Sequence, residues 1–385
     1  MQNAYIRPAR KQSHIKVIKH MVVFLAILLS IVIFIPALIV NISEIPLRFT
    51  YPSVTPITHQ ASASKNVNPI PPEQPLSNSG IQLGWTGNQI NTNTLARYKG
   101  LNIISPPAGS IDKQFHLHVS SNPLTNETLH NQNQHVWARI TMGQDVKQTI
   151  HELLASPSKS DSLIKSMNQA AQQNHWDGIN LDIENVSNQD RNAFSQFIKN
   201  ISSTLHQSHI ILSIDIPVDV KAGNDSSPFD HQVLGQYCDY IALMGYDEHW
   251  STDPNPGPIT SLPWLTNGLT ELMQTGIPAN KIILGLPAYT RIWKQNQTAM
   301  LADPAYPFHY VEQQLLQNHR TLNWDPQLGE YYSSYRDNNH NEYKIWLANE
   351  KSLQIYLTLI SKYHLAGSAI WNLDMIDTTT WNKLY

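Results

Sequence analysis

Cysteine is almost absent from this chain, since Cys238 is the only one in 385 residues. This excludes an internal disulfide framework and any zinc or iron–sulfur site built from several cysteines. The 17 histidines show no H-E-x-x-H or other paired-ligand spacing, so we expect no metal and no cofactor.

Charge is also scarce, because Asp, Glu, Lys and Arg together make up 14% of the residues. The formal net charge is −3 at pH 7, so no basic surface is expected and no nucleic-acid partner is predicted. We expect a monomer.

Charge is missing altogether from Met21 to Val40, a run of 20 residues. A helix of that length rises about 30 Å, which matches the hydrocarbon core of a bilayer. Five basic residues and no acidic one precede the run, which keeps the N-terminus cytoplasmic. We therefore expect a basic cytoplasmic tail over residues 1–20 and a transmembrane signal anchor over 21–41. The body of the protein would lie at the cell membrane, outside the cytoplasm.

A cleaved signal peptide, which would give a secreted protein, is the alternative to this anchor. Its apolar core would be shorter, and a small-residue cleavage site would follow. Residues 42–80 hold seven prolines among Ser, Thr and Asn, and this composition predicts an extended linker.

From residue 81 onward, short β-rich runs alternate with helical patterns. The helical patterns include 146–154, 160–173, 190–206, 265–274 and 352–363. The alternation predicts a parallel sheet, and eight strands in about 300 residues suit a (β/α)8 TIM barrel. A doubly wound open sheet is less well supported, because no Gly-rich dinucleotide fingerprint follows the first strand. The predicted strands are 81–86, 101–105, 135–141, 178–184, 210–216, 240–246, 281–288 and 366–373.

The segment 290–343 is too long for an ordinary loop of such a barrel. It contains a helical pattern at 310–317 and turn-rich stretches, so we expect a small α+β insertion between strands 7 and 8. The catalytic barrel would then occupy residues 81–385.

The predicted strand 178–184 is apolar on one face, with Ile179, Leu181 and Ile183, and polar on the other. Asp182 and Glu184 stand two residues apart on the polar face. Burial and mutual repulsion of two carboxylates raise a pKa, which suits a general acid. A strand-end ion pair with Lys or Arg is the structural alternative.

Further polar and aromatic residues follow other predicted strands, at the carboxyl-terminal rim where barrel enzymes carry their sites. Tyr246 and Asp247 follow one strand, Tyr289 and Arg291 another, and Trp371 ends the last. Tyr289, Arg291 and Glu248 could equally form structural contacts. Trp85 and Trp250 are candidate platforms for stacking sugars.

The motif Asp177-Gly178-x-x-x-Asp182-x-Glu184 resembles the catalytic strand of glycoside hydrolase family 18, the chitinase-like barrels. Met244-Gly245-Tyr246-Asp247, Gly285 to Tyr289 and Gly367 to Leu373 resemble that family's later motifs, in the same order. The segment 246–264 is most similar to the branch of spore-cortex-lytic N-acetylglucosaminidases.

The resemblance implies substrate-assisted hydrolysis with retention. Glu184 would be the acid and base, Asp182 would orient the substrate's acetamide, and Tyr246 would hydrogen-bond its carbonyl oxygen. Asp177 would support Asp182 from beneath, and Trp371 would form the floor under the sugar. The resemblance adds binding or supporting roles for Asn180, Met244, Asp247, Tyr289 and Arg291.

Some residues depart from the family pattern. Asn180 stands where chitinases commonly have a third aspartate, and an asparagine at this position resembles the cortex-lytic branch. We expect an altered pH profile with activity retained. Ala288 and Thr290 replace the usual residues near the seventh strand, and no Gly follows Leu373.

The sequence therefore predicts a glycosidase that cleaves β-1,4 bonds in N-acetylglucosamine-containing polysaccharide, with peptidoglycan or spore cortex favoured. A chitinase with the same mechanism is the nearest alternative. A non-catalytic glycan-binding protein and a membrane-tethered scaffold are alternatives of other classes.

Overall fold

The computed structural model describes residues 80–87, 91–142, 146–184, 186–218, 227–295 and 300–385. The predicted tail, anchor and nearly all of the linker lie outside these residues. Within the described ranges, no helix combines the length and the apolar character needed to cross a membrane.

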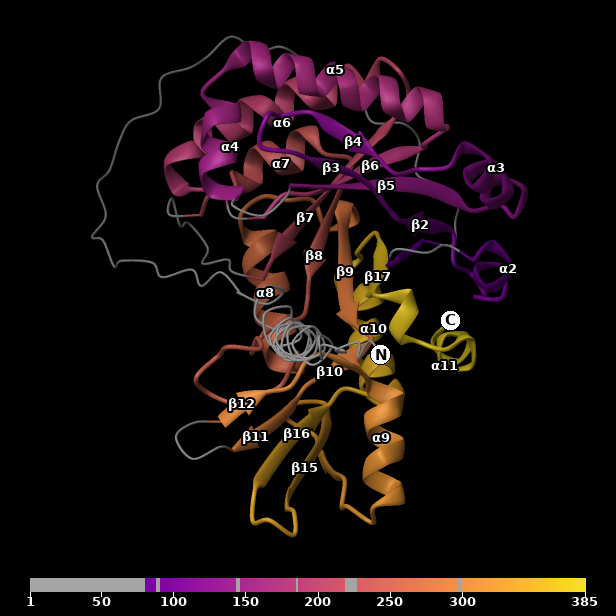
Figure 1. Cartoon of the computed structure of the whole chain (residues 1–385), viewed down its shortest axis with the longest axis vertical. Helices are drawn as coiled ribbons and strands as arrows, with labels where there is room; N and C mark the ends of the chain where they lie inside the picture. The colour runs from indigo at the N-terminus through magenta and orange to yellow at the C-terminus, as the bar shows by residue number, and fades with distance from the viewer. Residues whose placement is uncertain (1–79, 88–90, 143–145, 185, 219–226, 296–299) are drawn as a thin grey trace, which may run out of the picture. The chain divides into compact units, whose positions relative to one another are not determined.

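Eight parallel strands close into a barrel (Figure 1). β2 pairs with both β1 and β5, which completes the circle. The closed eight-stranded barrel predicted from the alternating pattern is confirmed, and each predicted strand range overlaps one barrel strand. In chain order the barrel strands are β1 (Ile81–Trp85), β2 (Ile103–Ser105), β5 (His135–Met142), β6 (Gly178–Asp182), β7 (Ile211–Pro217), β8 (Tyr240–Met244), β9 (Ile282–Pro287) and β17 (Gly367–Trp371).

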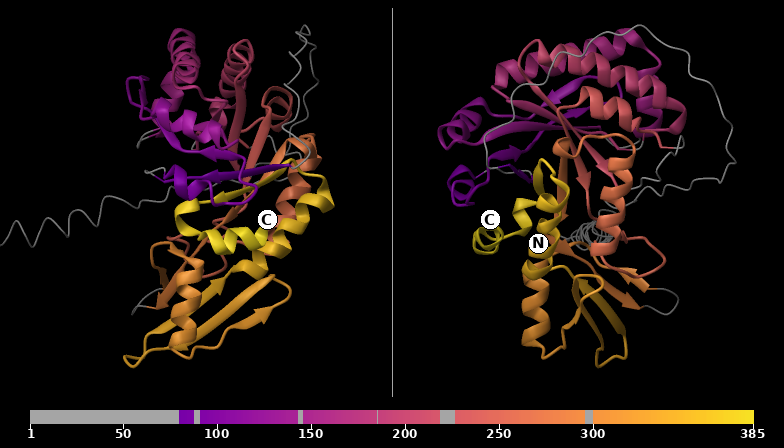
Figure 2. Two further views of the ribbon diagram at one scale, coloured as in Figure 1. Left: turned by 90° about the vertical axis from the view of Figure 1, so that its right-hand side faces the viewer. Right: turned by 180° about the vertical axis from the view of Figure 1, so that it is seen from behind.

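Helices surround the barrel, and α4 to α7 lie over the strands from β5 to β8 (Figures 1 and 2). A short hairpin extends the sheet beyond β5, formed by β3 (Pro107–Ile111) and β4 (Leu117–Val119). The helices are α2 (Thr92–Leu95), α3 (Pro123–Asn131), α4 (Val146–Leu154), α5 (Pro157–Asn174), α6 (Arg191–His206), α7 (His231–Tyr237), α8 (Leu262–Gln274), α10 (Glu350–Tyr363) and α11 (Thr378–Leu384).

Local chemistry sets several helix starts. Asn122, Ser261 and Asn349 each accept a backbone N–H with the side chain at the start of α3, α8 and α10. Such caps satisfy N–H groups that have no partner within the helix. Proline occupies the first turn of α3, α5 and α8, where its missing N–H costs nothing.

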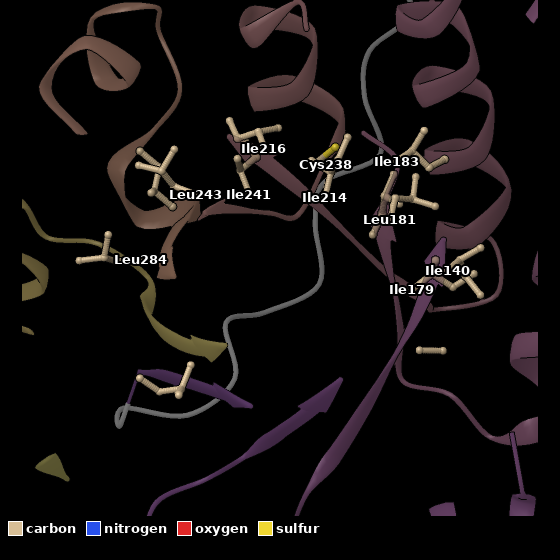
Figure 3. Close-up of a cluster of buried hydrophobic side chains, with 14 of the residues drawn as sticks. Ile140, Ile179, Leu181, Ile183, Ile214, Ile216, Cys238, Ile241, Leu243 and Leu284 are labelled. Carbon is tan, nitrogen blue, oxygen red and sulfur yellow. The ribbon is translucent and has the colours of Figure 1, made fainter. Parts of the chain in front are cut away.

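The core has two layers, as the alternation of strand side chains requires. Outward-facing residues pack between the barrel and its helices, among them Ile179 and Leu181 of β6 and Ile214 and Ile216 of β7 (Figure 3). Inward-facing residues fill the barrel itself. The rings of Trp137 and Tyr240 stack there, with centroids 5.1 Å apart.

The predicted insertion region contains an antiparallel sheet and one long helix, and its strands continue to Leu347. It docks on the loop after β8, because Trp293 Nε1 donates to the Gly257 carbonyl at 3.0 Å. Its elements are β10 (Tyr289–Thr290), β11 (Ile292–Gln295), β12 (Met300–Ala302), β13 (Tyr306–Pro307), α9 (Phe308–Gln317), β14 (Asn323–Asp325), β15 (Glu330–Arg336) and β16 (Glu342–Leu347).

Candidate active site

The barrel strand β6 carries two inward-facing polar residues toward its carboxyl-terminal end. Asn180 is fully buried, and the Asp182 side chain keeps 15% of its surface exposed. Between them Leu181 faces the outer layer, as predicted from the alternating pattern. Glu184 follows two residues after Asp182, just beyond the end of the strand.

Glu184 has a strongly perturbed carboxyl. Its side chain reaches solvent at the rim, but the surrounding protein still removes much of its hydration. This desolvation, together with the nearby charges of Asp182 and Asp247, raises the pKa of Glu184 to about 7. A carboxylic acid with that pKa holds a proton near neutral pH and can also release it.

Asp182 is paired with Arg139 of β5. The guanidinium Nη1 lies 3.3 Å from Asp182 Oδ2, and the Arg139 side chain is 10% exposed. Burial raises the pKa of Asp182, while the charge and hydrogen bond of Arg139 act in the opposite direction. An ion pair with Lys or Arg was the structural alternative for these two carboxylates, and Asp182 forms such a pair with Arg139.

Asn180 is the centre of a buried hydrogen-bond network. Its Oδ1 accepts from Trp85 Nε1 at 2.9 Å and from the Ser105 hydroxyl at 3.1 Å. Its Nδ2 donates to Asp215 Oδ1 at 2.7 Å and to Ser213 Oγ at 3.2 Å. These four contacts use the full hydrogen-bonding capacity of the amide, which fixes its orientation.

Asp215 of β7 is 3% exposed and belongs to the same network. Burial raises its pKa well above the usual range, and the charge of Asp182 adds to the rise. Neither Asp215 nor Arg139 was predicted from the sequence. Asp215 could have been found, because it is the only carboxylate in the mostly apolar strand ILSIDIP and lies on the same face as Ser213.

Four aromatic rings meet above this polar network. Trp371 stacks on Tyr246 with centroids 6.2 Å apart, and both rings contact Trp85 edge to face. The ring centroids of Tyr289 and Tyr246 are 6.3 Å apart. Trp371 and Tyr246 are only partly buried, whereas Trp85 is fully buried. Trp85 therefore belongs to the barrel core, and the interpretation of it as an open sugar platform is wrong.

The segment after β8 turns sharply at the rim. A Cβ on Gly245 would lie 2.5 Å from the Gly285 carbonyl oxygen, so only glycine permits this approach of β8 to β9. Asp247 adopts a left-handed φ of 59°, which aspartate tolerates. Its carboxylate accepts from the Tyr289 hydroxyl at 2.7 Å and pairs with Arg291 at 3.4 Å.

The sequence-predicted residues Asn180, Asp182, Glu184, Tyr246, Asp247, Tyr289, Arg291 and Trp371 therefore meet at one rim, beside the partly buried Met244. Asp177 does not join them. It precedes β6, accepts from the Val136 N–H at 2.7 Å, and contacts the rings of His130 and His135. The length of β6 separates it from Asp182 by about 15 Å, so its expected position beneath Asp182 is corrected.

A cavity of about 160 Å³ lies along the same rim, beyond β1 and β2. Its lining combines Gly87 and Pro106, which follow those strands, with the start of α3 around Ser121 and Asn122. Asp182 and Glu184 are not among its lining residues. In the described part of the chain, no three His, Cys, Asp or Glu side chains gather as a metal site.

The chain is similar to known glycosidases. The family model for glycosyl hydrolases family 18 matches residues 101–375, a range that contains every rim and network residue named above except Trp85. Uncharacterized glycosylase YvbX of Bacillus subtilis is 26% identical over 321 residues, which cover 80% of this chain and 91% of that protein.

The Cortical fragment-lytic enzyme of Bacillus subtilis is 24% identical over 234 residues, or 60% of this chain and 54% of that enzyme. The match thus spans about half of that relative's length. Among solved structures, a chitinase from Chromobacterium violaceum is similar with a TM-score of 0.70 and 20% identity. The similarity covers 79% of this chain and 98% of the chitinase, and at that identity it shows the fold.

Proposed function

The chain belongs to the glycosyl hydrolases of family 18 and is a glycosidase, and from that premise we propose that it cleaves β-1,4 bonds next to N-acetylglucosamine with retention. The observation that carries this proposal is the carboxyl of Glu184, whose pKa of about 7 suits it to give and take a proton.

In the first step, Glu184 donates its proton to the glycosidic oxygen as the bond to the anomeric carbon breaks. The carbonyl oxygen of the substrate's own acetamido group attacks that carbon and forms a cyclic oxazolinium ion. Glu184, now a carboxylate, then removes a proton from water, which opens the ring and restores the acid. No carboxylate of the protein needs to form a covalent bond.

In this proposal, Asp182 and Tyr246 assist the acetamido group. An ionised Asp182 accepts the acetamide N–H and stabilises the positive charge that develops on the ring. The high pKa of Tyr246, which burial causes, keeps its hydroxyl protonated so that it can donate to the carbonyl oxygen. The partly exposed Trp371 ring offers an apolar floor for the sugar.

Peptidoglycan or spore cortex is the favoured substrate in this proposal. Support comes from the cortical fragment-lytic relative and from the predicted anchor at 21–41, which would hold the enzyme beside the cell wall. The localisation is part of the proposal. Protease digestion of intact and broken cells would test it, because an exported barrel is cut in intact cells and a cytoplasmic one only after lysis.

The function is tested by incubating the detergent-solubilised full chain with purified peptidoglycan and with chitohexaose. Mass spectrometry should detect muropeptides ending in reducing N-acetylglucosamine, and Glu184→Gln should abolish them while the exposed Glu127→Gln leaves them unchanged. Cleavage of chitohexaose alone would identify a chitinase. Binding without product from either glycan would show a glycan-binding protein instead.

A further inference from the structure

Arg139 is a buried arginine in the middle of the catalytic rim. It lies on β5 opposite Asn180 of β6 and is only 8% exposed. Burying a guanidinium is costly unless its charge and N–H groups are matched by partners. Its contacts therefore indicate what the side chain does.

Three contacts hold the guanidinium in place. Nη1 lies 3.3 Å from Asp182 Oδ2, and Nη2 donates to the Thr86 carbonyl at 3.3 Å. The guanidinium carbon lies 4.7 Å from the centre of the Trp371 ring, within the range of cation–π attraction. Arg139 thus joins the carboxylate that would assist catalysis to the aromatic floor beneath the sugar.

Asp182 and Asp215 are two acids whose charges act on each other, and the two are placed differently. Asp182 is beside the Arg139 cation, whereas Asp215 is deeper and accepts its hydrogen bond from the neutral Asn180 amide. A cation at one carboxylate and burial at the other favour a single arrangement of charge. This arrangement favours the negative charge on Asp182, next to the guanidinium, and the proton on the deeper Asp215.

Four titratable or charged groups interact electrostatically with Asp182. They are Glu184 beyond its own strand, Asp215 from β7, Tyr246 after β8 and Arg139 from β5. Among these four, Arg139 alone carries a positive charge.

We propose that Arg139 is a positioning residue that holds Asp182 as an ionised carboxylate turned toward the acetamido group of the substrate, while Asp215 retains the proton of the pair. The inference rests on the proposed hydrolase function and deepens it. It requires no contact between Arg139 and the reacting atoms. The guanidinium acts by fixing the charge and orientation of Asp182.

The test compares Arg139→Gln and Arg139→Lys with the exposed control Arg97→Gln in the full chain, on whichever glycan the wild type cleaves. Arg139→Gln should lower kcat about 10²-fold, the scale of a misplaced catalytic group, with KM close to wild type. The acidic limb of the kcat/KM profile should move up by about one pH unit or more, because Asp182 loses its cation. Arg139→Lys should recover part of the rate and of the shift.

A folded Arg139→Gln protein with an unmoved acidic limb would overturn the inference, as would a lysine variant no better than glutamine. Circular dichroism and thermal unfolding of each variant separate loss of fold from loss of charge. If the glutamine variant does not fold, the lysine variant alone decides, through the position of its acidic limb. A wild type without hydrolysis would instead refute the proposed function, so the two failures are distinguishable.

Discussion

The side-chain amide of Asn180 donates a 2.7 Å hydrogen bond to the buried carboxyl of Asp215. Its oxygen accepts from Trp85 and Ser105 at the same time, so the amide can adopt only one orientation. A carboxylate at position 180 would lack the N–H that Asp215 Oδ1 accepts. The neutral residue and the acid on the neighbouring strand therefore depend on each other.

Asn180→Asp should consequently destabilise the fold. The variant places another acid in a buried network and removes the N–H that Asp215 accepts, and leaving a buried polar group without its partner costs about 1–3 kcal/mol, more when the group is charged. The cost should be smaller at pH 5 than at pH 8, because protonation neutralises the new acid. Urea denaturation at both pH values measures it, with the exposed Asn338→Asp as a control. Equal losses at the two pH values would contradict this electrostatic origin.

The pH profile should carry the signature of Glu184. With a pKa of about 7, its acid form is lost as pH rises through neutrality, so the basic limb of kcat/KM should lie near pH 7. Desolvation is the larger cause of that pKa, and the charge of Asp182 comes second. Asp182→Asn should therefore slow the reaction and also move the basic limb partway to lower pH. An unmoved limb would show that Asp182 does not act on Glu184 through its charge.

The barrel was predictable because each strand carries its own local pattern. Runs of Ile, Leu and Val between helical segments define eight strands, and parallel strands require a shared rim for residues such as Glu184 and Tyr246. Arg139 and Asp215 were not found, because their importance arises from pairing with β6. Each is the only Asp, Glu, Lys or Arg residue of its strand, and no local pattern tells which distant side chain it meets.

Asp177 shows the opposite case, in which a sequence motif predicted a contact that the fold does not make. The motif places it five residues before Asp182, and a family resemblance joined the two in one site. Strand geometry separates them, because one residue precedes β6 and the other ends it. Its hydrogen bond from the Val136 N–H makes it a structural partner at the other end of the barrel.

A second buried acid should make the stability of the protein depend on pH. Glu330 of β15 is 1% exposed, and neither carboxyl oxygen has a hydrogen-bond partner among the described residues. Burial raises its pKa well above the usual range, and the charge of Glu248 adds to the rise. The folded state therefore keeps a proton that the unfolded state releases above about pH 4.5, its ordinary pKa. Stability should fall as pH rises above that value.

Glu330→Gln removes this proton-linked penalty and should stabilise the protein at pH 8, by about 1.4 kcal/mol for each unit by which the pKa is raised. Near pH 4 the gain should disappear. Glu342→Gln on the neighbouring strand is the matched control, because Glu342 is partly exposed and pairs with Arg336 and Lys344. Thermal unfolding across pH measures both variants. A gain that is the same at both pH values would point to packing rather than proton release.

The two tryptophans that meet at the rim should differ in what their replacement changes. Trp371 is partly exposed, stacks on Tyr246 and would contact the sugar, so Trp371→Ala should lower kcat/KM by about 10²-fold or more. Trp85 is fully buried and donates its indole N–H to Asn180. Trp85→Phe should mainly lower the free energy of unfolding, by about 1–3 kcal/mol, because the Asn180 oxygen loses a donor. Steady-state kinetics and urea denaturation of both variants measure these two effects. A larger loss of kcat/KM from Trp85→Phe than from Trp371→Ala would mean that Trp371 is not the floor of the sugar site.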